Sequence, residues 1–318
     1  MSILITGSNG FVGRYAAEYY FKNTAYQIFC LDLAHSGRIE NERVQYLDAD
    51  LLSLERVHEI IKEKRPRKVL HLAALSSVAG SVKNPYTALQ TNIFSWINLV
   101  ESFRLENLTP RILFVSSSEV YGTPESDKIM REESHPLKPE TPYAASKAAC
   151  ELVARQYCST YGQKIVVARP FNHTGPGQSD TFVLSSFAKR LMEVKVLNRE
   201  PVIYTGNIEV ERDFLDVRDV IRAYALLLEK GKSCEAYNIC SGGALPLRWM
   251  LEELIKMSGV KVEVRMDMNL ARKYDIPLLV GSNAKILAET GWKPEIAFTD
   301  TLKSLLEYWQ AKLTEKPA

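Results

Sequence analysis

Short apolar runs alternate with longer amphipathic stretches along the first half of the chain. The apolar runs predict buried strands at Ser2 to Thr6, Gln27 to Asp32, Val44 to Leu47, Lys68 to Ala73, Arg111 to Ser117 and Lys164 to Arg169. Between them, helical patterns are found at Phe11 to Tyr20, Leu54 to Lys64, Pro85 to Arg104 and Tyr143 to Tyr161. This alternation predicts an α/β fold with a parallel sheet covered on both faces.

The pattern changes after Arg169-Pro170, where a loop rich in Gly, Pro, Asn and His extends to Asp180. Mixed short strands and helices follow, and Thr299 to Leu313 has the spacing of an amphipathic surface helix. We therefore predict a Rossmann-like, doubly wound dinucleotide-binding domain over residues 1–170, with a return around residues 213–241. A smaller mixed α/β substrate-binding domain is expected over residues 171–318.

Glycines follow the first strand at positions 7, 10 and 13, immediately before a helical pattern. Gly7 suits a sharp turn, Gly10 lets the backbone approach a pyrophosphate, and Gly13 permits close helix packing. A glycine turn without a ligand is the simpler alternative. Asp32 ends the second strand, where a carboxylate would bind the adenosine ribose and favour NADH, although Arg38 could permit NADPH.

Tyr143 and Lys147 lie four residues apart at the start of a helical run, so both face the same way. A lysine cation beside a tyrosine would lower the phenol pKa and make it a usable proton donor or acceptor. Ser117 ends a buried strand, where ligands of open parallel sheets sit, and its hydroxyl could bond a substrate carbonyl. On their own, the pair could be a solvated helix face and the serine a turn former.

The composition narrows the function classes. With 40 basic and 38 acidic residues the net charge is +2, which argues against nucleic acid as the main partner. No N-terminal signal or membrane-length apolar run is visible, so we expect a cytoplasmic protein without membrane contact. The cysteines and histidines have no metal-ligand spacing, and we expect neither a metal nor a disulfide. His71 and His173 are expected to be hydrogen-bonded structural residues.

Longer motifs support a family resemblance. They are T-G-x-x-G-F-V-G at Thr6 to Gly13, Asp50-Leu51, His71-Leu-Ala-Ala74, S-S-S-E-V-Y-G at Ser116 to Gly122, Tyr143-x-x-x-Lys147 and Arg169-Pro-Phe-Asn172. The chain resembles the extended short-chain dehydrogenases/reductases that act on nucleotide sugars. The resemblance implies NADPH or NADH as cofactor and Ser117, Tyr143 and Lys147 as catalytic residues. It implies cofactor contacts from Gly7, Asn9, Gly10, Phe11, Val12, Gly13, Asp32, Asp50, Leu51, Leu72, Ala73, Ala74, Tyr143, Lys147 and Phe171.

The second half resembles the members of this family that handle GDP-mannose and its 4-keto-6-deoxy derivative. The matching segments are Asn172-His-Thr-Gly-Pro-Gly, Asp180-Thr-Phe-Val183, Thr205-Gly-Asn207, Arg212-Asp-Phe-Leu-Asp216 and Gly291-Trp-Lys-Pro294. The resemblance implies substrate contacts from Ser117, Glu119, Tyr143, Asn172, Val183, Asn207, Arg212 and Arg272. Two arginines, Arg212 and Arg272, would hold the pyrophosphate of a GDP-sugar.

The resemblance is nearer to a reductase than to a dehydratase. Dehydratases of this branch typically open with G-x-x-G-Q-D-G, whereas this chain has Ser8-Asn9-Gly10-Phe11-Val12. We therefore expect NAD(P)H-dependent reduction of the 4-keto group of GDP-4-keto-6-deoxy-D-mannose to GDP-D-rhamnose. The alternatives are a GDP-mannose 4,6-dehydratase with Glu119 as the base, another nucleotide-sugar epimerase or dehydratase, or a non-enzymatic dinucleotide-binding regulator.

Two helical stretches, Pro85 to Arg104 and Tyr143 to Tyr161, are rich in apolar residues and should cover the sheet. Their outer faces could also form a helical homodimer contact, as in many relatives. The sequence leaves three questions open: the preference for NADH or NADPH, the role of Glu119, and the stereochemistry of the product at carbon 4.

Overall fold

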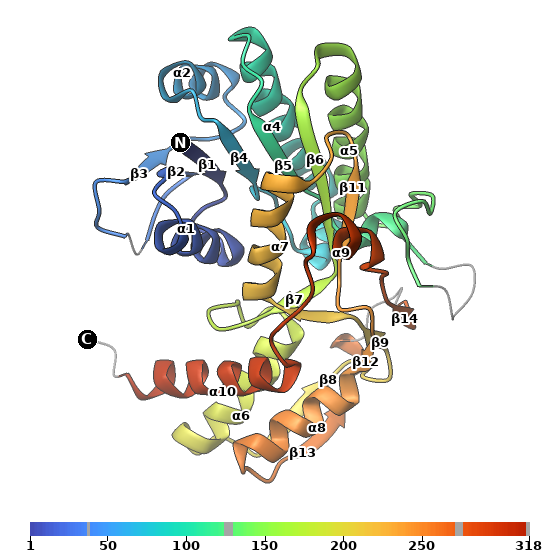
Figure 1. Cartoon of the computed structure of the whole chain (residues 1–318). Coiled ribbons are helices and arrows are strands. Elements are labelled where there is room, and N and C mark those ends of the chain that lie inside the picture. The colour runs from blue at the N-terminus through green and yellow to red at the C-terminus, as the bar shows by residue number, and fades with distance from the viewer. Residues whose placement is uncertain (37–38, 124–129, 271–275, 316–318) are drawn as a thin grey trace.

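The computed structural model of the chain describes residues 1–36, 39–123, 130–270 and 276–315 (Figure 1). Its centre is a seven-stranded parallel sheet with strand order β11-β6-β5-β4-β1-β2-β3. The strands are β1 (Ser2–Thr6), β2 (Gln27–Asp32), β3 (Val44–Asp48), β4 (Lys68–His71), β5 (Arg111–Val115), β6 (Lys164–Pro170) and β11 (Ala236–Ile239). The order reverses between β4 and β1, which creates a crevice at the carboxyl ends of these strands.

Helices cover both faces of the sheet, as Figure 1 shows. On one face lie α1 (Phe11–Asn23) and α7 (Val217–Lys230), together with the short α9 (Ala284–Thr290). On the other lie α2 (Leu54–Lys64), α4 (Pro85–Leu105) and α5 (Pro142–Tyr161). Each face has its own apolar core, with Tyr20 and Tyr224 buried in the first and Trp96 and Phe103 in the second. The predicted doubly wound α/β fold is confirmed.

Most of the remaining elements pack together beyond the carboxyl ends of the strands (Figure 1). The helices are α6 (Val183–Leu197), α8 (Leu247–Ser258) and α10 (Phe298–Thr314), which share a third apolar core. The paired strands are β7 (Asn172–Thr174) with β10 (Phe214–Asp216), β8 (Val202–Thr205) with β13 (Glu263–Met266), and β9 (Glu211–Arg212) between β12 (Leu245–Pro246) and β14 (Leu278–Leu279). The expected amphipathic helix is present as α10, with Leu302, Leu305 and Trp309 buried.

The structure differs from the expected elements at a few places. Two expected strands end earlier, β4 at His71 and β5 at Val115, because the chain leaves the sheet there to form loops. A short helix that the pattern did not reveal, α3 (Val78–Lys83), precedes α4. The chain returns to the sheet through α7 and β11, and β11 pairs with β6. The division into two domains at residue 170 stays a prediction.

Two features are absent from the residues that the structure describes. None of the helices in those ranges is both long and apolar enough to cross a bilayer. Within the same ranges, no three side chains of the His, Cys, Asp and Glu types gather in a way that could hold a metal ion.

Candidate active site

The glycine turn after β1 leaves no room for side chains. Gly7 has φ +69°, and a Cβ there would lie 2.7 Å from the backbone nitrogen of Ala73. A Cβ at Gly13 would lie 2.2 Å from the Gly7 carbonyl oxygen. Gly10 precedes α1, and no side chain caps the first turn of that helix. The turn therefore offers the free amides of a long helix to an anion, which fits the pyrophosphate of a dinucleotide.

Asp32 stands beside this turn and fixes it. The Asn9 amide donates to Asp32 Oδ2 at 2.9 Å, and the amide after Asp32 donates to Oδ1 at 2.8 Å. The Asn9 side chain accepts from Arg14 Nη2 at 3.1 Å and from the Ser36 amide at 3.2 Å. A carboxylate and a guanidinium thus share the edge where the adenosine ribose is expected. Arg38 lies outside the described residues.

The loop after β4 lies against the glycine turn. The Leu72 amide donates to the Thr6 carbonyl at 3.2 Å, and the Ala73 amide lies 3.4 Å from Thr6 Oγ1. Both residues are half-buried, as is Ala74, which follows them. Because this loop and the turn meet at the crevice between β1 and β4, they are placed as a pyrophosphate site requires.

The other predicted cofactor residues differ in exposure. Phe11 and Val12 are half-buried in the first turn of α1. Asp50 is exposed after β3, while its neighbour Leu51 is buried in the core. Phe171 is only 2% exposed, and its ring fills the space beside Gly281. Its side chain is therefore a core element in this structure.

The three predicted catalytic residues lie together at the carboxyl end of β5. Ser117 follows this strand, and its Oγ accepts from the Glu119 amide at 3.2 Å. Ser117 is close enough to Tyr143 for its side chain to lower the pKa of that phenol. Lys147 Nζ donates to the Val115 carbonyl at 2.7 Å and lies 6.0 Å from the centre of the Tyr143 ring.

Local sequence explains how α5 presents Tyr143. Thr141 caps the helix by accepting from the Ala144 amide at 3.1 Å, and Pro142 occupies the first helical position. Tyr143 is thus in the first turn, where its own amide has no partner within the helix. Ser81 on α3 supplies that partner, since its Oγ accepts from the Tyr143 amide at 3.2 Å.

The expected lowering of the Tyr143 pKa is wrong in direction. Burial raises the pKa of Tyr143 to about 12, the hydrogen bond with Ser117 lowers it, and the nearby charge of Glu119 raises it. Burial also lowers the pKa of Lys147 to about 8, against the favourable influence of Cys150 and Glu151. Desolvation penalises every charged form, so both groups shift towards neutrality.

A buried network beneath this site was missed from the sequence. Glu151 accepts from Arg169 Nη2 at 2.7 Å and from Ser116 Oγ at 2.5 Å. Arg169 Nη1 also donates to the Tyr121 hydroxyl at 2.8 Å. The network ties α5 to the ends of β5 and β6. Helical spacing is the sequence signal that could have revealed Glu151, since it lies one turn after Lys147 on the same face of α5.

Both histidines singled out in the sequence are hydrogen-bonded, as expected. His71 Nδ1 lies 2.8 Å from Thr6 Oγ1, and burial lowers the His71 pKa to about 3. His173 Nδ1 lies 3.0 Å from the Phe171 carbonyl oxygen, and burial lowers its pKa as well. Imidazoles of this kind, with lowered pKa values, stay neutral and join neighbouring segments of the chain.

The predicted substrate residues are spread along the C-terminal layer. Asn172 is half-buried in β7, and Val183 is the exposed first residue of α6. Arg212 is buried in β9, where Nη1 donates to the Glu211 carbonyl at 2.9 Å and to the Ile276 carbonyl. Arg272 lies outside the described residues. Asn207 is exposed beside a cavity of about 190 Å³.

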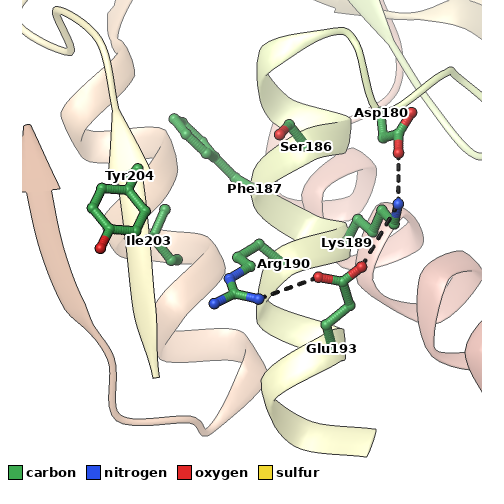
Figure 2. A pocket seen from close by; sticks show the side chains of 8 residues that line it. All are labelled: Asp180, Ser186, Phe187, Lys189, Arg190, Glu193, Ile203 and Tyr204. Atoms are coloured by element: carbon green, nitrogen blue, oxygen red, sulfur yellow. Dashed lines mark hydrogen bonds and ion pairs between the residues drawn. The ribbon is translucent and has the colours of Figure 1, made fainter. Parts of the chain in front are cut away.

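A second cavity, of about 240 Å³, lies between α6 and β8 (Figure 2). In Figure 2, Phe187 extends from α6 towards β8, where Tyr204 is 48% exposed. Lys189 Nζ forms ion pairs with Asp180 Oδ2 at 2.6 Å and with Glu193 Oε1 at 3.6 Å. The cavity therefore combines the accessible Tyr204 ring with a charged rim. Phe187, which lines it, lies one helical turn after Val183.

Comparisons with known proteins agree with this geometry. A family described as GDP-mannose 4,6 dehydratase matches residues 4–305. The GDP-6-deoxy-D-mannose reductase of Pseudomonas aeruginosa is 34% identical, with 99% of each chain covered. The GDP-6-deoxy-D-talose 4-dehydrogenase of Aggregatibacter actinomycetemcomitans is 28% identical, again with 99% of each chain covered.

A solved structure is similarly close. The RMD protein of Pseudomonas aeruginosa complexed with NADPH superposes with a TM-score of 0.87 at 32% identity, over 98% of this chain and 100% of that one. NADPH is one of the two cofactors predicted from the sequence. The match of the family over nearly the whole chain, with the glycine turn and the Ser117, Tyr143 and Lys147 cluster in place, shows that this chain belongs to the GDP-mannose 4,6-dehydratase family of extended short-chain dehydrogenases/reductases and is an NAD(P)-dependent oxidoreductase.

Proposed function

We propose that the protein uses NADPH or NADH to reduce the 4-keto group of GDP-4-keto-6-deoxy-D-mannose, giving GDP-D-rhamnose. The observation that carries the proposal is the grouping of Ser117, Tyr143 and Lys147 at the carboxyl end of β5, at the same sheet edge as the glycine turn. Similarity to a GDP-6-deoxy-D-mannose reductase over 99% of both chains supports the GDP-sugar part.

A bound reduced nicotinamide would supply the hydride for carbon 4 of the sugar. The chain's own residues would handle the oxygen and the proton. Ser117 would hydrogen-bond the keto oxygen as negative charge develops there, and Tyr143 would donate its proton to that oxygen. Burial raises the pKa of Tyr143 to about 12, so the phenol is protonated at neutral pH, as a proton donor must be.

Lys147 would act after the proton leaves Tyr143. Its ammonium lies 6.0 Å from the Tyr143 ring centre, and the Val115 carbonyl holds it there. A cation at this distance stabilises the phenolate that donation creates. It would also face the nicotinamide ribose, the role that the family resemblance implies.

The GDP part would lie across the C-terminal layer. The cavity between α6 and β8 supports this placement, because the accessible Tyr204 ring could stack on a purine and the charged rim could pair with its polar edge (Figure 2). Arg212 and Arg272 would hold the pyrophosphate, with Asn172 bonding a phosphate or sugar hydroxyl. Replacing Tyr204 by Ala should then weaken GDP binding and leave NADPH binding unchanged.

The second candidate is a GDP-mannose 4,6-dehydratase, and Glu119 favours it. Its charge is close enough to Tyr143 to raise the pKa of that phenol. A dehydratase needs a base near the reacting carbons and retained oxidised cofactor, whereas a reductase needs exchangeable reduced cofactor. The matched family also carries the dehydratase description.

One pair of assays decides between these candidates. The purified protein is incubated with GDP-4-keto-6-deoxymannose and NADPH or NADH, and the product is identified by NMR. It is also incubated with GDP-mannose and catalytic NADP. Rapid cofactor oxidation and a D-rhamno product support the reductase. A D-talo product would reverse the stereochemistry at carbon 4, and formation of keto-sugar from GDP-mannose would establish the dehydratase.

We also propose a homodimer through α4 and α5. Phe94 is 54% exposed on α4 and Leu152 is 66% exposed on α5, and these helices lie side by side on one face (Figure 1). Exposed apolar groups on adjacent helices are suited to a symmetric helical contact. Light scattering of the wild type and of Leu152→Asp tests this, since the variant should be monomeric if the helices form the interface.

A further inference from the structure

Two cysteines that are distant in the sequence meet at one backbone carbonyl. Cys158 lies in the last turn of α5, and Cys234 lies between α7 and β11. Cys158 Sγ donates to the Ile165 carbonyl oxygen at 3.7 Å. The Cys234 amide donates to the same oxygen at 2.7 Å. The meeting point is at the start of β6, the opposite edge of the sheet from Ser117 and Tyr143.

The two cysteines are therefore neighbours through their shared partner. Cys234 is close enough to Cys158 to contribute to the raised pKa of that thiol. Cys158 is buried, whereas Cys234 is exposed. A reagent from solution therefore reaches Cys234 before it reaches Cys158. An accessible thiol backed by a second thiol is the arrangement found in reversible thiol oxidation.

The backbone of Cys234 is unusual. Its φ is +67°, a left-handed conformation that side chains with a Cβ rarely adopt. In the described ranges, the other non-glycine residues with positive φ are Arg65, Asn107 and Asn198. The amide of Cys234 in this conformation donates to the Ile165 carbonyl, the group that Cys158 Sγ also contacts. Such outliers tend to occur where a side chain has a specific task.

The remaining thiols lack this arrangement. Cys30, Cys150 and Cys240 are all buried. Burial raises the pKa of Cys30 and of Cys150 to about 12, which suppresses their thiolates. Solvent-borne reagents should therefore discriminate between Cys234 and these three in the folded protein.

We propose that Cys158 and Cys234 form a thiol–disulfide exchange site that reacts with small disulfides such as glutathione disulfide. The Cys234 thiolate attacks one glutathione sulfur, forming a mixed disulfide and releasing the first glutathione. The Cys158 thiolate then attacks the Cys234 sulfur, closing the internal disulfide and releasing the second glutathione. Two cysteine thiols are oxidised, one glutathione disulfide is reduced to two thiols, and the cysteine protons pass to the released thiolates. All five cysteines are free thiols in the structure, so the proposed bond forms only on oxidation.

Burial of Cys158 slows the second step at neutral pH. It raises the pKa of Cys158 to about 12, so its thiolate is scarce at neutral pH. The mixed disulfide should therefore accumulate briefly before the internal disulfide closes, and closure should accelerate as the pH rises.

The internal disulfide would tie the end of α5 to the connection between α7 and β11. Tyr143 and Lys147 lie at the other end of α5, so the cross-link should leave turnover unchanged. Because the bond closes a long loop, it restricts the unfolded chain. The oxidised protein should melt roughly 4 °C or more above the reduced protein.

Mass spectrometry tests the site on the whole protein. Folded samples are incubated with glutathione disulfide, quenched in acid, alkylated and digested. The wild type should yield one peptide pair linked through Cys158 and Cys234, with no glutathione retained at completion. Cys158→Ala should retain one glutathione on Cys234, and Cys234→Ser should retain none and form no link.

Either of two results would overturn the proposal. One is a wild type that keeps a stable mixed disulfide at Cys234 without closing the bond. The other is a link that involves Cys30, Cys150 or Cys240 while the protein is still folded. Cys234→Ser replaces an exposed residue and should fold, so its oxidised and reduced samples should melt at the same temperature.

Discussion

Replacing Tyr143 by Phe removes one hydroxyl and leaves the ring in place. The lost group is the phenol whose pKa Ser117 lowers, and it would be the proton donor in the proposed reaction. Losing a positioned proton donor lowers turnover by about a hundredfold or more, which corresponds to about 2.7 kcal/mol of barrier. The lost hydrogen bond should reduce the free energy of unfolding by only about 1 kcal/mol. Folding and cofactor binding should therefore survive.

Tyr20 provides a matched control. It is also fully buried, and its hydroxyl has no hydrogen-bond partner among the described residues. Tyr20→Phe removes the same atom from α1, so it should keep wild-type turnover and be equally or more stable. Turnover is measured by the absorbance of NADPH with the keto-sugar, and NADPH binding by fluorescence. Near wild-type turnover in Tyr143→Phe would refute the assignment of this phenol as the proton donor.

The pH profile extends the same test. The pKa of Tyr143 is about 12, so the phenol keeps its proton through the neutral range. The pKa of Lys147 is about 8, so its cation is present below that pH and is lost as the pH rises through it. The rate of ketone reduction should therefore be highest below about pH 8 and fall above it. A rate that rises steadily from pH 7 to pH 10 would contradict this assignment.

Four further substitutions test the neighbouring residues. Asp32→Ala should shift the ratio of NADH to NADPH affinity by about tenfold towards NADPH, because a carboxylate repels a 2'-phosphate. An unchanged ratio in fluorescence titrations would show that Asp32 only stabilises the turn. Arg212→Ala should weaken GDP binding by about ten- to a hundredfold in calorimetry while NADPH binding is unaltered, and equal GDP affinity would remove Arg212 from the site. Glu119→Gln should keep most of the reductase activity, and complete loss would indicate a catalytic base. Glu151→Gln should lower the free energy of unfolding in urea by about 3–5 kcal/mol, since Arg169 would remain buried without its counter-charge, and a loss below about 1 kcal/mol would contradict the buried pair.

Local sequence patterns were enough to predict the sheet, the crossover helices and the glycine turn. These features depend on local patterns: runs of Val, Ile and Leu between helical periods, and glycines where a Cβ would meet the backbone. The proximity of Tyr143 and Lys147 also follows from helical spacing alone. Ser117 could be placed beside them because the carboxyl ends of parallel strands share one edge.

The pKa shifts of the site residues, and the buried contacts beneath them, could be seen only in the folded structure. The spacing of Tyr143 and Lys147 suggested a lowered phenol pKa, but burial depends on all the elements packed around α5 and shifts the pKa upwards. The partners of Glu151 and Cys158 lie on β6 and beyond α7, far along the chain. No local pattern encodes these side-chain contacts, because they form only when the folded sheet brings separate segments together.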